Sequence, residues 1–145
     1  MDKEYYILLA KVRMERAMEL LGEAKTLLET NAYKSANNRA FYAIEKAIKA
    51  LLALKETDVM THNGALKQFN FLFVFQGDGA FGAEDYQKIA RAEQIRNASD
   101  YDDFYVANKE ETRQQVTNAE YIIEKISDYM RQKENFNGDN INWNR

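Results

Sequence analysis

Apolar side chains recur along this chain at alternating steps of three and four residues, the spacing that places them on one face of an α-helix. The pattern covers residues 3–29, is repeated over 33–55, and returns between Asn108 and Met130. Asn108 and Glu111 also have the spacing of a capping box, which marks a helix start. These segments are therefore predicted to be long amphipathic helices. The middle one has an apolar face made mostly of alanine, which lets a neighbouring helix approach closely: Ala36, Ala40, Ala43, Ala47 and Ala50.

Between these long segments the pattern predicts two further helices. Residues 56–61 read as a connector, and His62 stands at the start of a third helix. A fourth helix is expected over residues 83–99, with Tyr86, Ile89, Glu93 and Arg96 along one side. Residues 100–107 are then predicted to form a loop.

The run of residues 69–75 fits two patterns. Its four phenylalanines alternate with period two, as in a strand, but Phe69, Leu72 and Phe73 also share one helical face. An isolated strand leaves its backbone groups unpaired, and no partner strand is recognisable. We therefore expect a helix, followed by a Gly-rich loop over 76–82. So many phenylalanines exceed what one helix face of a small bundle buries, which favours a self-association surface.

Taken together, these elements predict an all-α fold. Five helices with mostly short connections favour an antiparallel up-and-down bundle of about five helices. The absence of proline agrees with this, since proline breaks helix interiors. Residues 1–133 are expected to form a single domain, and the Asn-rich residues 134–145 a disordered tail.

Composition narrows the possible chemistry. The chain has no cysteine, so disulfides, thiolate metal sites and cysteine nucleophiles are excluded. It has one histidine, which excludes histidine-rich metal sites, and we expect no metal or cofactor. The net charge of −3 argues against coating nucleic acid without regard to sequence, although a local basic pocket remains compatible with it. No apolar stretch reaches the roughly 18 residues of a membrane helix. A cytoplasmic protein without membrane contact is expected.

Three basic residues are candidates for a site, and each has an ordinary alternative. Arg96 would anchor a phosphate, or would pair with Glu93 or Asp100 as helix-end electrostatics. Arg39 would line the same cleft, or would reach a carboxylate elsewhere in the bundle. His62 would serve as a proton-transfer group, or would cap the third helix or bond to a neighbouring helix.

The segment after Arg96 adds acidic and aromatic candidates. Asp100, Asp102 and Asp103 would hold a hard cation or form a solvated loop. The aromatic residues Tyr101, Phe104 and Tyr105 would stack on bases or pack the loop back onto the bundle.

Four stretches in this order resemble a prokaryotic HEPN protein, of the compact branch often encoded beside a minimal nucleotidyltransferase. They are the segment from Tyr33 to Ala43 (YKSANNRAFYA) with the alanine-rich helix after it, THNG at 61–64, RNASDYD at 96–102, and the last helix with Ala119 and YII at 121–123. The matching stretches span most of residues 5–130.

The resemblance implies a four- or five-helix bundle that usually dimerises. Some members cut RNA without metal, and others bind nucleotides or work with a nucleotidyltransferase in a toxin–antitoxin or defence pair. In the nucleolytic members an Arg holds the scissile phosphate, and a His four to six residues later moves a proton. This chain keeps the Arg as Arg96 but has no His in the seven residues after it.

Three hypotheses remain open. In the first, the chain is a dimeric HEPN module that binds a nucleotide or RNA phosphate through Arg39, Arg96, Asp100 and Tyr101 and acts with a nucleotidyltransferase partner. In the second, it is a metal-independent endoribonuclease toxin in which Arg96 holds the phosphate and His62 or Tyr101 transfers the proton. In the third, it is a helical scaffold without a ligand.

Overall fold

The computed structural model describes residues 3–133. It contains helices over all the segments that the apolar pattern predicts, and no strand among these residues. The elements are α1 (Lys3–Glu29), α2 (Tyr33–Ala53), α3 (His62–Phe69), a π-helix η1 (Asn70–Phe75), α4 (Ala83–Tyr101) and α5 (Lys109–Arg131).

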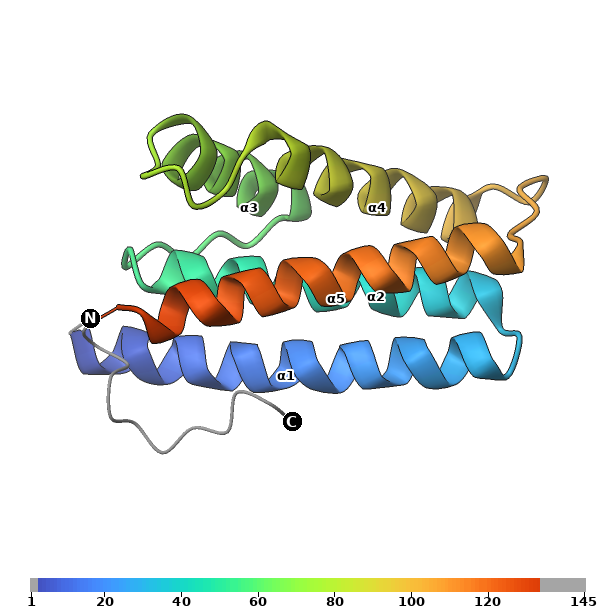
Figure 1. The fold of residues 1–145 in the computed structure, drawn as a ribbon, viewed down its shortest axis with the longest axis horizontal. Coiled ribbons are helices and arrows are strands. Elements are labelled where there is room, and N and C mark those ends of the chain that lie inside the picture. The colour runs from blue at the N-terminus through green and yellow to red at the C-terminus, as the bar shows by residue number, and fades with distance from the viewer. Residues whose placement is uncertain (1–2, 134–145) are drawn as a thin grey trace.

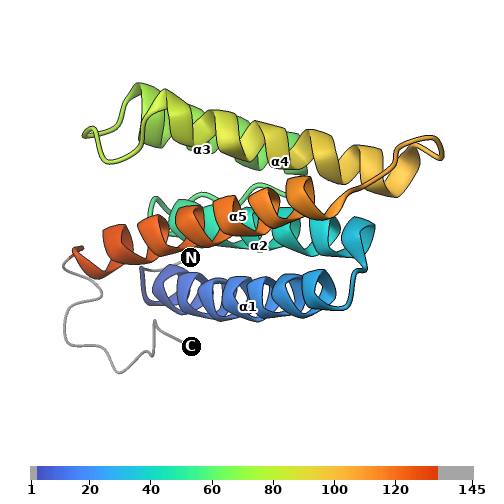
Figure 2. The same ribbon diagram turned by 45° about the vertical axis from the view of Figure 1, so that its right-hand side comes forward.

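The long helices α2 and α5 lie together in the middle of the molecule (Figures 1 and 2). Helix α1 packs along one side of this pair, and α3 and α4 lie along the opposite side. Consecutive helices α1 and α2 are antiparallel, as are α4 and α5. The connector after α2 runs back along the bundle, so that α3 starts opposite the middle of α2 and runs in the same direction. As a result, α2 contacts each of the other α-helices.

Alanine forms the seam between α1 and α2, the most extensive helix contact in the molecule. The five alanines predicted for the apolar face of α2 are completely buried. On α1, Ala10, Ala17 and Ala24 are equally buried. Small side chains on both helices let the backbones approach closely, and Ile, Leu and Met side chains on either side fill the remaining core.

The phenylalanine run is helical, as expected, but it is a π-helix rather than an α-helix. Phe69 and Phe73 turn into the core, where they contact Phe81 and Tyr129. The wider π-turn sends the remaining two phenylalanines of the run outward. Gly77 lies two residues after the π-helix, and a Cβ there would lie 2.1 Å from the Phe73 carbonyl oxygen, so only glycine fits.

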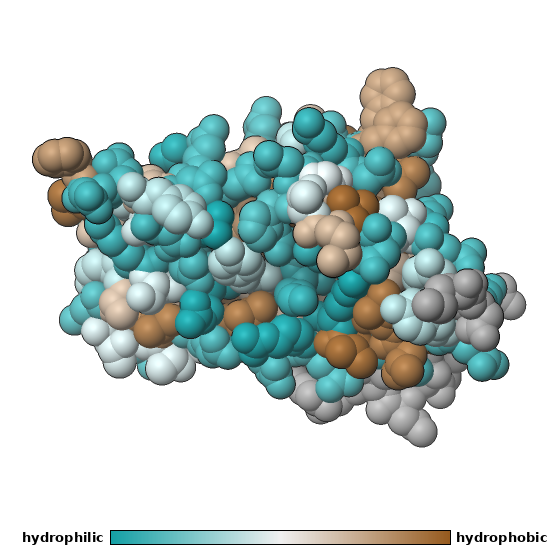
Figure 3. All heavy atoms as spheres, turned by 180° about the vertical axis from the view of Figure 1, so that it is seen from behind, coloured by the Kyte–Doolittle hydropathy of each residue, from teal (hydrophilic) through white to brown (hydrophobic). Residues whose placement is uncertain are grey.

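The outward-facing members of the run are Phe71 and Phe75, whose rings stack 6.2 Å apart. They are 47% and 80% exposed, which agrees with a surplus of aromatic side chains beyond what the core takes. They border a hollow of about 310 Å³ together with Lys67, Asn70 and Tyr86. The face of the molecule shown in Figure 3 is mostly polar, and its apolar side chains occur in separate small groups.

Helix ends depart slightly from the predicted positions. Helix α2 ends at Ala53 rather than Lys55, and α4 continues to Tyr101, so that Asp100 and Tyr101 belong to its last turn and not to a loop. The expectation of a loop from residue 100 is therefore wrong by two residues. The Asn108 side chain accepts a hydrogen bond from the Glu111 N–H at 2.8 Å, which confirms the predicted helix start.

A buried carboxylate fastens α4 to α5. Asp85 is 3% exposed and accepts hydrogen bonds from the Lys125 ammonium (2.8 Å), the Tyr121 hydroxyl (3.0 Å) and the Gly82 N–H (2.8 Å). Burial raises the pKa of Asp85, but these donors together outweigh burial and hold the pKa below its ordinary value. Asp85 therefore remains charged and sets the position of α4, the helix that carries Arg96.

None of the helices within residues 3–133 combines the length and the apolar character needed to cross a bilayer. The predicted tail over 134–145 lies outside the described residues.

Candidate functional site

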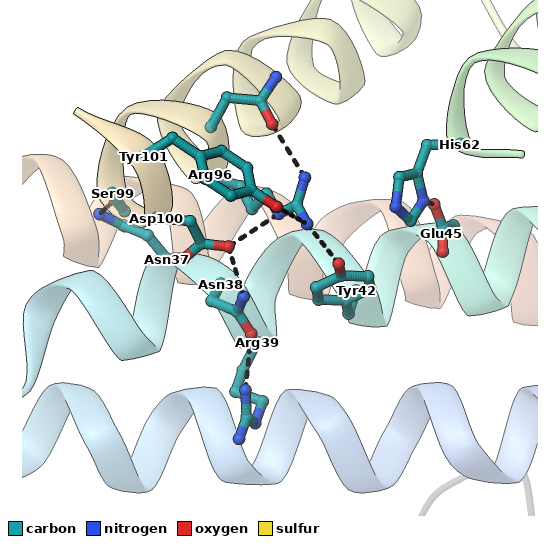
Figure 4. A network of polar contacts seen from close by, with 11 residues as sticks. Asn37, Asn38, Arg39, Tyr42, Glu45, His62, Arg96, Ser99, Asp100 and Tyr101 are labelled. Carbon is teal, nitrogen blue, oxygen red and sulfur yellow. Dashed lines mark hydrogen bonds and ion pairs between the residues drawn. The ribbon is translucent and has the colours of Figure 1, made fainter.

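The Arg96 side chain lies between α4 and α2 and not in open solvent (Figure 4). Only 7% of the residue is exposed. Its guanidinium carbon lies 5.0 Å from the ring centre of Tyr42, 5.4 Å from that of Tyr101 and 5.8 Å from that of Phe41. A cation this close to several aromatic faces is attracted by each of them, most strongly where water is excluded. The site is thus an aromatic enclosure around one guanidinium.

Polar contacts fix the orientation of that guanidinium. Its Nε pairs with the Asp100 carboxylate at 3.0 Å, one turn further along α4. One terminal nitrogen donates to the Asn97 side-chain oxygen at 2.9 Å, and the other donates to the Tyr42 hydroxyl and, at 3.5 Å, to the Tyr101 hydroxyl. The ion pair weighed from sequence is therefore present with Asp100 and not with Glu93. Arg96 also donates a hydrogen bond to Tyr42 on α2, so it links two helices and does not only pair with a residue of its own helix.

A series of hydrogen-bonded polar side chains connects the surroundings of Arg96 to α1. Asn38 donates to the Asp100 carboxylate at 2.9 Å and accepts from Arg39 at 2.6 Å. Arg39 also donates to Glu23 on α1 at 3.0 Å. Arg39 therefore reaches a carboxylate in the bundle, which is one of the two alternatives considered for it. Through Asn38 it is also connected to Asp100 beside Arg96.

His62 stands on the opposite side of Tyr42 from Arg96 (Figure 4). Its Nδ1 is hydrogen-bonded to the Glu45 carboxylate, whose side chain is only 4% exposed. The imidazole ring contacts Phe41 and Tyr42 edge-on, with ring centres 5.9 and 5.6 Å apart. Of the alternatives considered for His62, the structure shows the hydrogen bond to a neighbouring helix, here to Glu45 on α2. Thr61, and not His62, caps α3 by accepting from the Gly64 N–H.

The acidic and aromatic residues after Arg96 have separate roles. Asp102 caps the turn by accepting from the Phe104 N–H at 3.0 Å, while Asp100 is engaged with Arg96. Within residues 3–133 no three His, Asp or Glu side chains come together in a way that would hold a metal ion. Phe104 is 94% exposed and does not pack onto the bundle.

Tyr105, in contrast, does pack back. Its hydroxyl donates to Glu111 on α5, and burial together with this carboxylate raises the pKa of Tyr105 to about 12. Tyr101 combines the two behaviours, because its hydroxyl faces Arg96 while 72% of the residue is exposed. It is the aromatic side chain of this segment best placed to meet a ligand at Arg96.

The structure brings Arg96, Asp100 and Tyr101 into direct contact, and places Arg39 and His62 next to them through one intermediate each. Those intermediates, Asn38 and Tyr42, were not identified as site residues from sequence, nor was Glu45. A signal existed for all three: they follow one another at steps of four and three, and so share one face of α2. This spacing marks a polar stripe beside the buried alanine face of α2.

A model of the HEPN domain matches residues 10–130, which is most of the chain. This chain belongs to the HEPN domain family. The resemblance noted from the sequence is thereby confirmed, and the helical bundle fits the HEPN fold.

Individual relatives are similar along most of their length. Two proteins of Methanocaldococcus jannaschii, each named Putative toxin, are 28% identical over 129 residues and 33% identical over 114 residues. The first match covers 89% of this chain and 86% of that protein, and the second covers 78% and 82%. A UPF0332 protein of Thermotoga maritima is 32% identical over 111 residues, covering 77% of this chain and 83% of that protein.

Proposed function

We propose that this HEPN protein binds a nucleotide or RNA phosphate at Arg96 and acts as one half of a toxin–antitoxin or defence pair. In this proposal it forms a homodimer and its partner is a nucleotidyltransferase. The toxin role rests on the relatives named Putative toxin. The ligand class rests on the chemistry around Arg96.

One observation carries the binding proposal: the Arg96 guanidinium is held almost out of solvent by aromatic rings and a single ion pair. Asp100 is its only carboxylate partner among the described residues, and three aromatic rings supply most of the remaining surroundings. A guanidinium has five N–H donors in a rigid fork, which suits the oxygens of a phosphate. The contact to the Tyr101 hydroxyl is the longest of its polar contacts, at 3.5 Å. A phosphate oxygen would replace this contact first, with the exposed Tyr101 ring left to stack on a base.

The binding proposal is tested by fluorescence anisotropy with a labelled single-stranded oligoribonucleotide and, in competition, with free nucleotides. The Arg96→Ala variant is expected to bind at least about tenfold more weakly, because a charge-assisted contact to phosphate contributes about 1.5–3 kcal/mol. Arg91→Ala is the matched control. Arg91 lies on the same helix, but its side chain is 57% exposed and pairs with Glu111. Equal affinities for the two variants, or no binding by the wild type, would refute the proposal.

The assembly is tested separately. Sedimentation equilibrium of the purified chain is expected to give twice the monomer mass. Co-expression with a nucleotidyltransferase encoded beside it is expected to give a complex that survives gel filtration. A monomer that forms no such complex would remove this part of the proposal and leave the binding test unaffected.

A metal-independent endoribonuclease is the second candidate, and the position of His62 favours it. A histidine held by a buried carboxylate lies close to the phosphate-binding candidate Arg96, on the other side of Tyr42. RNA incubated in EDTA with wild type and with Arg96→Ala decides between the candidates. Cleavage that survives chelation and disappears in the variant supports the enzyme, and inactivity of both proteins removes it.

A further inference from the structure

Helix α1 carries apolar side chains on its outer side as well as on the side that packs against α2 and α5. Figures 1 and 2 show α1 at the edge of the molecule, on the opposite side of α2 and α5 from α4. Leu8 is 60% exposed and Val12 is 55% exposed. A helix at the edge of a monomer normally turns polar side chains toward solvent. The outer side of α1 is therefore a candidate for an interface.

The outward-facing positions of α1 follow the spacing of a seam between two helices. They recur at alternating steps of three and four residues, which keeps them on one stripe along the helix. We call this set the outer stripe, and it consists of Tyr5, Leu8, Val12, Glu15, Glu19, Gly22 and Thr26. Its first three members are large and apolar, and its last two are small. The outer stripe thus has bulk at one end and space at the other.

The small residues of the outer stripe border a hollow of about 610 Å³, lined by Gly22, Glu23, Thr26, Leu27 and Arg39. Gly22 lies inside a 27-residue helix, where glycine is less favourable than alanine. A Cβ at this position would meet no other part of the described chain within 4 Å. Packing within residues 3–133 therefore does not require a glycine here, whereas a side chain that enters the hollow from outside would need the room.

Bulk and space on the outer stripe match when a second copy of α1 runs antiparallel to the first. Leu8 and Val12 are four residues apart, as are Gly22 and Thr26. When Val12 of one copy faces Gly22 of the other, Leu8 faces Thr26, and a two-fold axis passes beside Ala17. Each contact then occurs twice, as in any isologous interface. Ala17 lies one residue from the middle of α1, so the two helices overlap along nearly their full length of about 40 Å.

The charges of α1 favour the same direction. Residues 3–16 contain four basic and two acidic residues, a net charge of +2, and residues 17–29 contain one basic and three acidic residues, a net charge of −2. Antiparallel copies place these opposite charges together, and their helix dipoles also oppose each other. Near the axis Glu15 of one copy approaches Glu19 of the other, and Arg16, which pairs with Glu19 at 3.2 Å, offsets this repulsion. A parallel pair would place like charges together.

We infer that two copies of this chain associate through the outer stripe of α1, antiparallel and about a two-fold axis. The inference rests on the homodimer of the proposed function and names its interface. Each copy places Leu8 and Val12 against Thr26 and Gly22 of the other. Figure 4 shows Arg96 on the side of α2 that faces away from α1, so the interface leaves both Arg96 side chains of the dimer accessible to a ligand.

The first test traps the register. Because the chain has no cysteine, the double variant Val12→Cys/Gly22→Cys contains only the two introduced thiols. Oxidation with copper phenanthroline is expected to give a covalent dimer as the major product on a non-reducing gel. The two positions lie ten residues apart on one helix, about 15 Å, which is too far for a disulfide within the chain. Val12→Cys alone is the control and should stay unlinked, since its two copies lie equally far apart across the axis.

The second test measures the mass by sedimentation equilibrium. Val12→Glu is expected to weaken dimerisation at least about 100-fold, because a central apolar contact is lost twice and the new carboxylate faces Glu23 in the hollow. Phe75→Glu is the matched control. Phe75 is an equally apolar side chain on η1, 80% exposed, and its replacement should leave the mass at twice that of the monomer. Circular dichroism checks that both variants keep their helices.

The outcomes separate this interface from the proposed function. If the wild type is a dimer and Val12→Glu does not weaken it, or if the double variant links no better than Val12→Cys, the inference is overturned and the homodimer stands. If the wild type is a monomer and the double variant does not link, both are overturned, and the outer stripe has another occupant, either residues 134–145 or a different protein. Oligoribonucleotide binding at Arg96 is measured independently by anisotropy, and Val12→Glu should bind as the wild type does.

Discussion

Replacing Asp85 by asparagine would remove the charge that fastens α4 to α5. The carboxylate is 3% exposed and receives three hydrogen bonds, one of them from the Lys125 ammonium at 2.8 Å. Asparagine has nearly the same shape and keeps one acceptor oxygen, so it preserves part of the hydrogen bonding and opens no cavity. The variant therefore isolates the charge.

The expected loss of stability follows from these contacts. A hydrogen bond to a charged group contributes about 1.5–3 kcal/mol, and removing one partner of a fully buried pair costs about 3–5 kcal/mol. The Lys125 side chain is 32% exposed and keeps part of its hydration, which places the loss near the lower figure. We expect the free energy of unfolding to fall by about 2 kcal/mol at pH 7. For a chain of this size that corresponds to about 6 °C in the midpoint.

The same reasoning gives the dependence on pH. The pKa of Asp85 in the folded state lies below its ordinary value, so the charged carboxylate stabilises the fold fully above the unfolded-state pKa of about 3.9. That contribution is lost as the pH falls through the folded-state pKa. The difference between wild type and Asp85→Asn should therefore be constant near neutral pH and should shrink below about pH 4.

Urea unfolding followed by circular dichroism, at several pH values, measures this difference. Asp128→Asn is the matched control, since Asp128 is largely exposed and its ion-pair partner within residues 3–133 is Arg131 on its own helix. It should leave the midpoint nearly unchanged. If Asp85→Asn is as stable as the wild type at pH 7, or if its deficit does not diminish in acid, the account of this contact is wrong.

Three further predictions concern the core and one ionisable group. Ala47→Leu should destabilise the chain by about 1–3 kcal/mol in urea unfolding, because the α1–α2 seam has no room for a larger side chain; an unchanged midpoint would contradict close packing there. Phe69→Ala should lower the free energy of unfolding by about 3–5 kcal/mol, whereas Phe75→Ala, on the exposed side of the same run, should lower it much less. Equal losses of stability would contradict the assignment of Phe69 to the core and Phe75 to the surface. In a spectrophotometric alkaline titration, the difference between wild type and Tyr105→Phe should show one tyrosine that ionises near pH 12. Burial and the Glu111 carboxylate disfavour its phenolate form. Ionisation of this tyrosine near pH 10 would exclude the contact with Glu111.

The sequence predicted the long helices well because their signal is local. The alanine face of α2 follows directly from spacing, and Asn108 marks a helix start through a side-chain contact with a residue three positions away. The phenylalanine run could be predicted to be helical only from its neighbours. In the core, Phe69 packs against Phe81 in the loop after the run, and Phe73 packs against Tyr129 on α5. The second contact joins segments that lie far apart in the sequence, so no local pattern indicates it.

The site was predictable only in part, for the same reason. Arg96 and Tyr101 lie in a short segment whose resemblance to HEPN proteins draws attention to it. The extent of α4 was underestimated because Asp100 is held in the helix by its ion pair with Arg96 and by Asn38 from α2, a contact between distant segments. The pairing of His62 with Glu45 likewise requires the connector after α2 to run back along the bundle, and connector paths have no periodic signal.

A crystal structure of the chain with a bound 2′-O-methyl oligoribonucleotide tests the central claim most directly. The account predicts a phosphate on the Arg96 guanidinium, with the exposed Tyr101 ring stacked on a neighbouring base. A phosphate bound elsewhere on the molecule, with Arg96 still enclosed by Tyr42, Tyr101 and Asp100 as it is in the free chain, would contradict it.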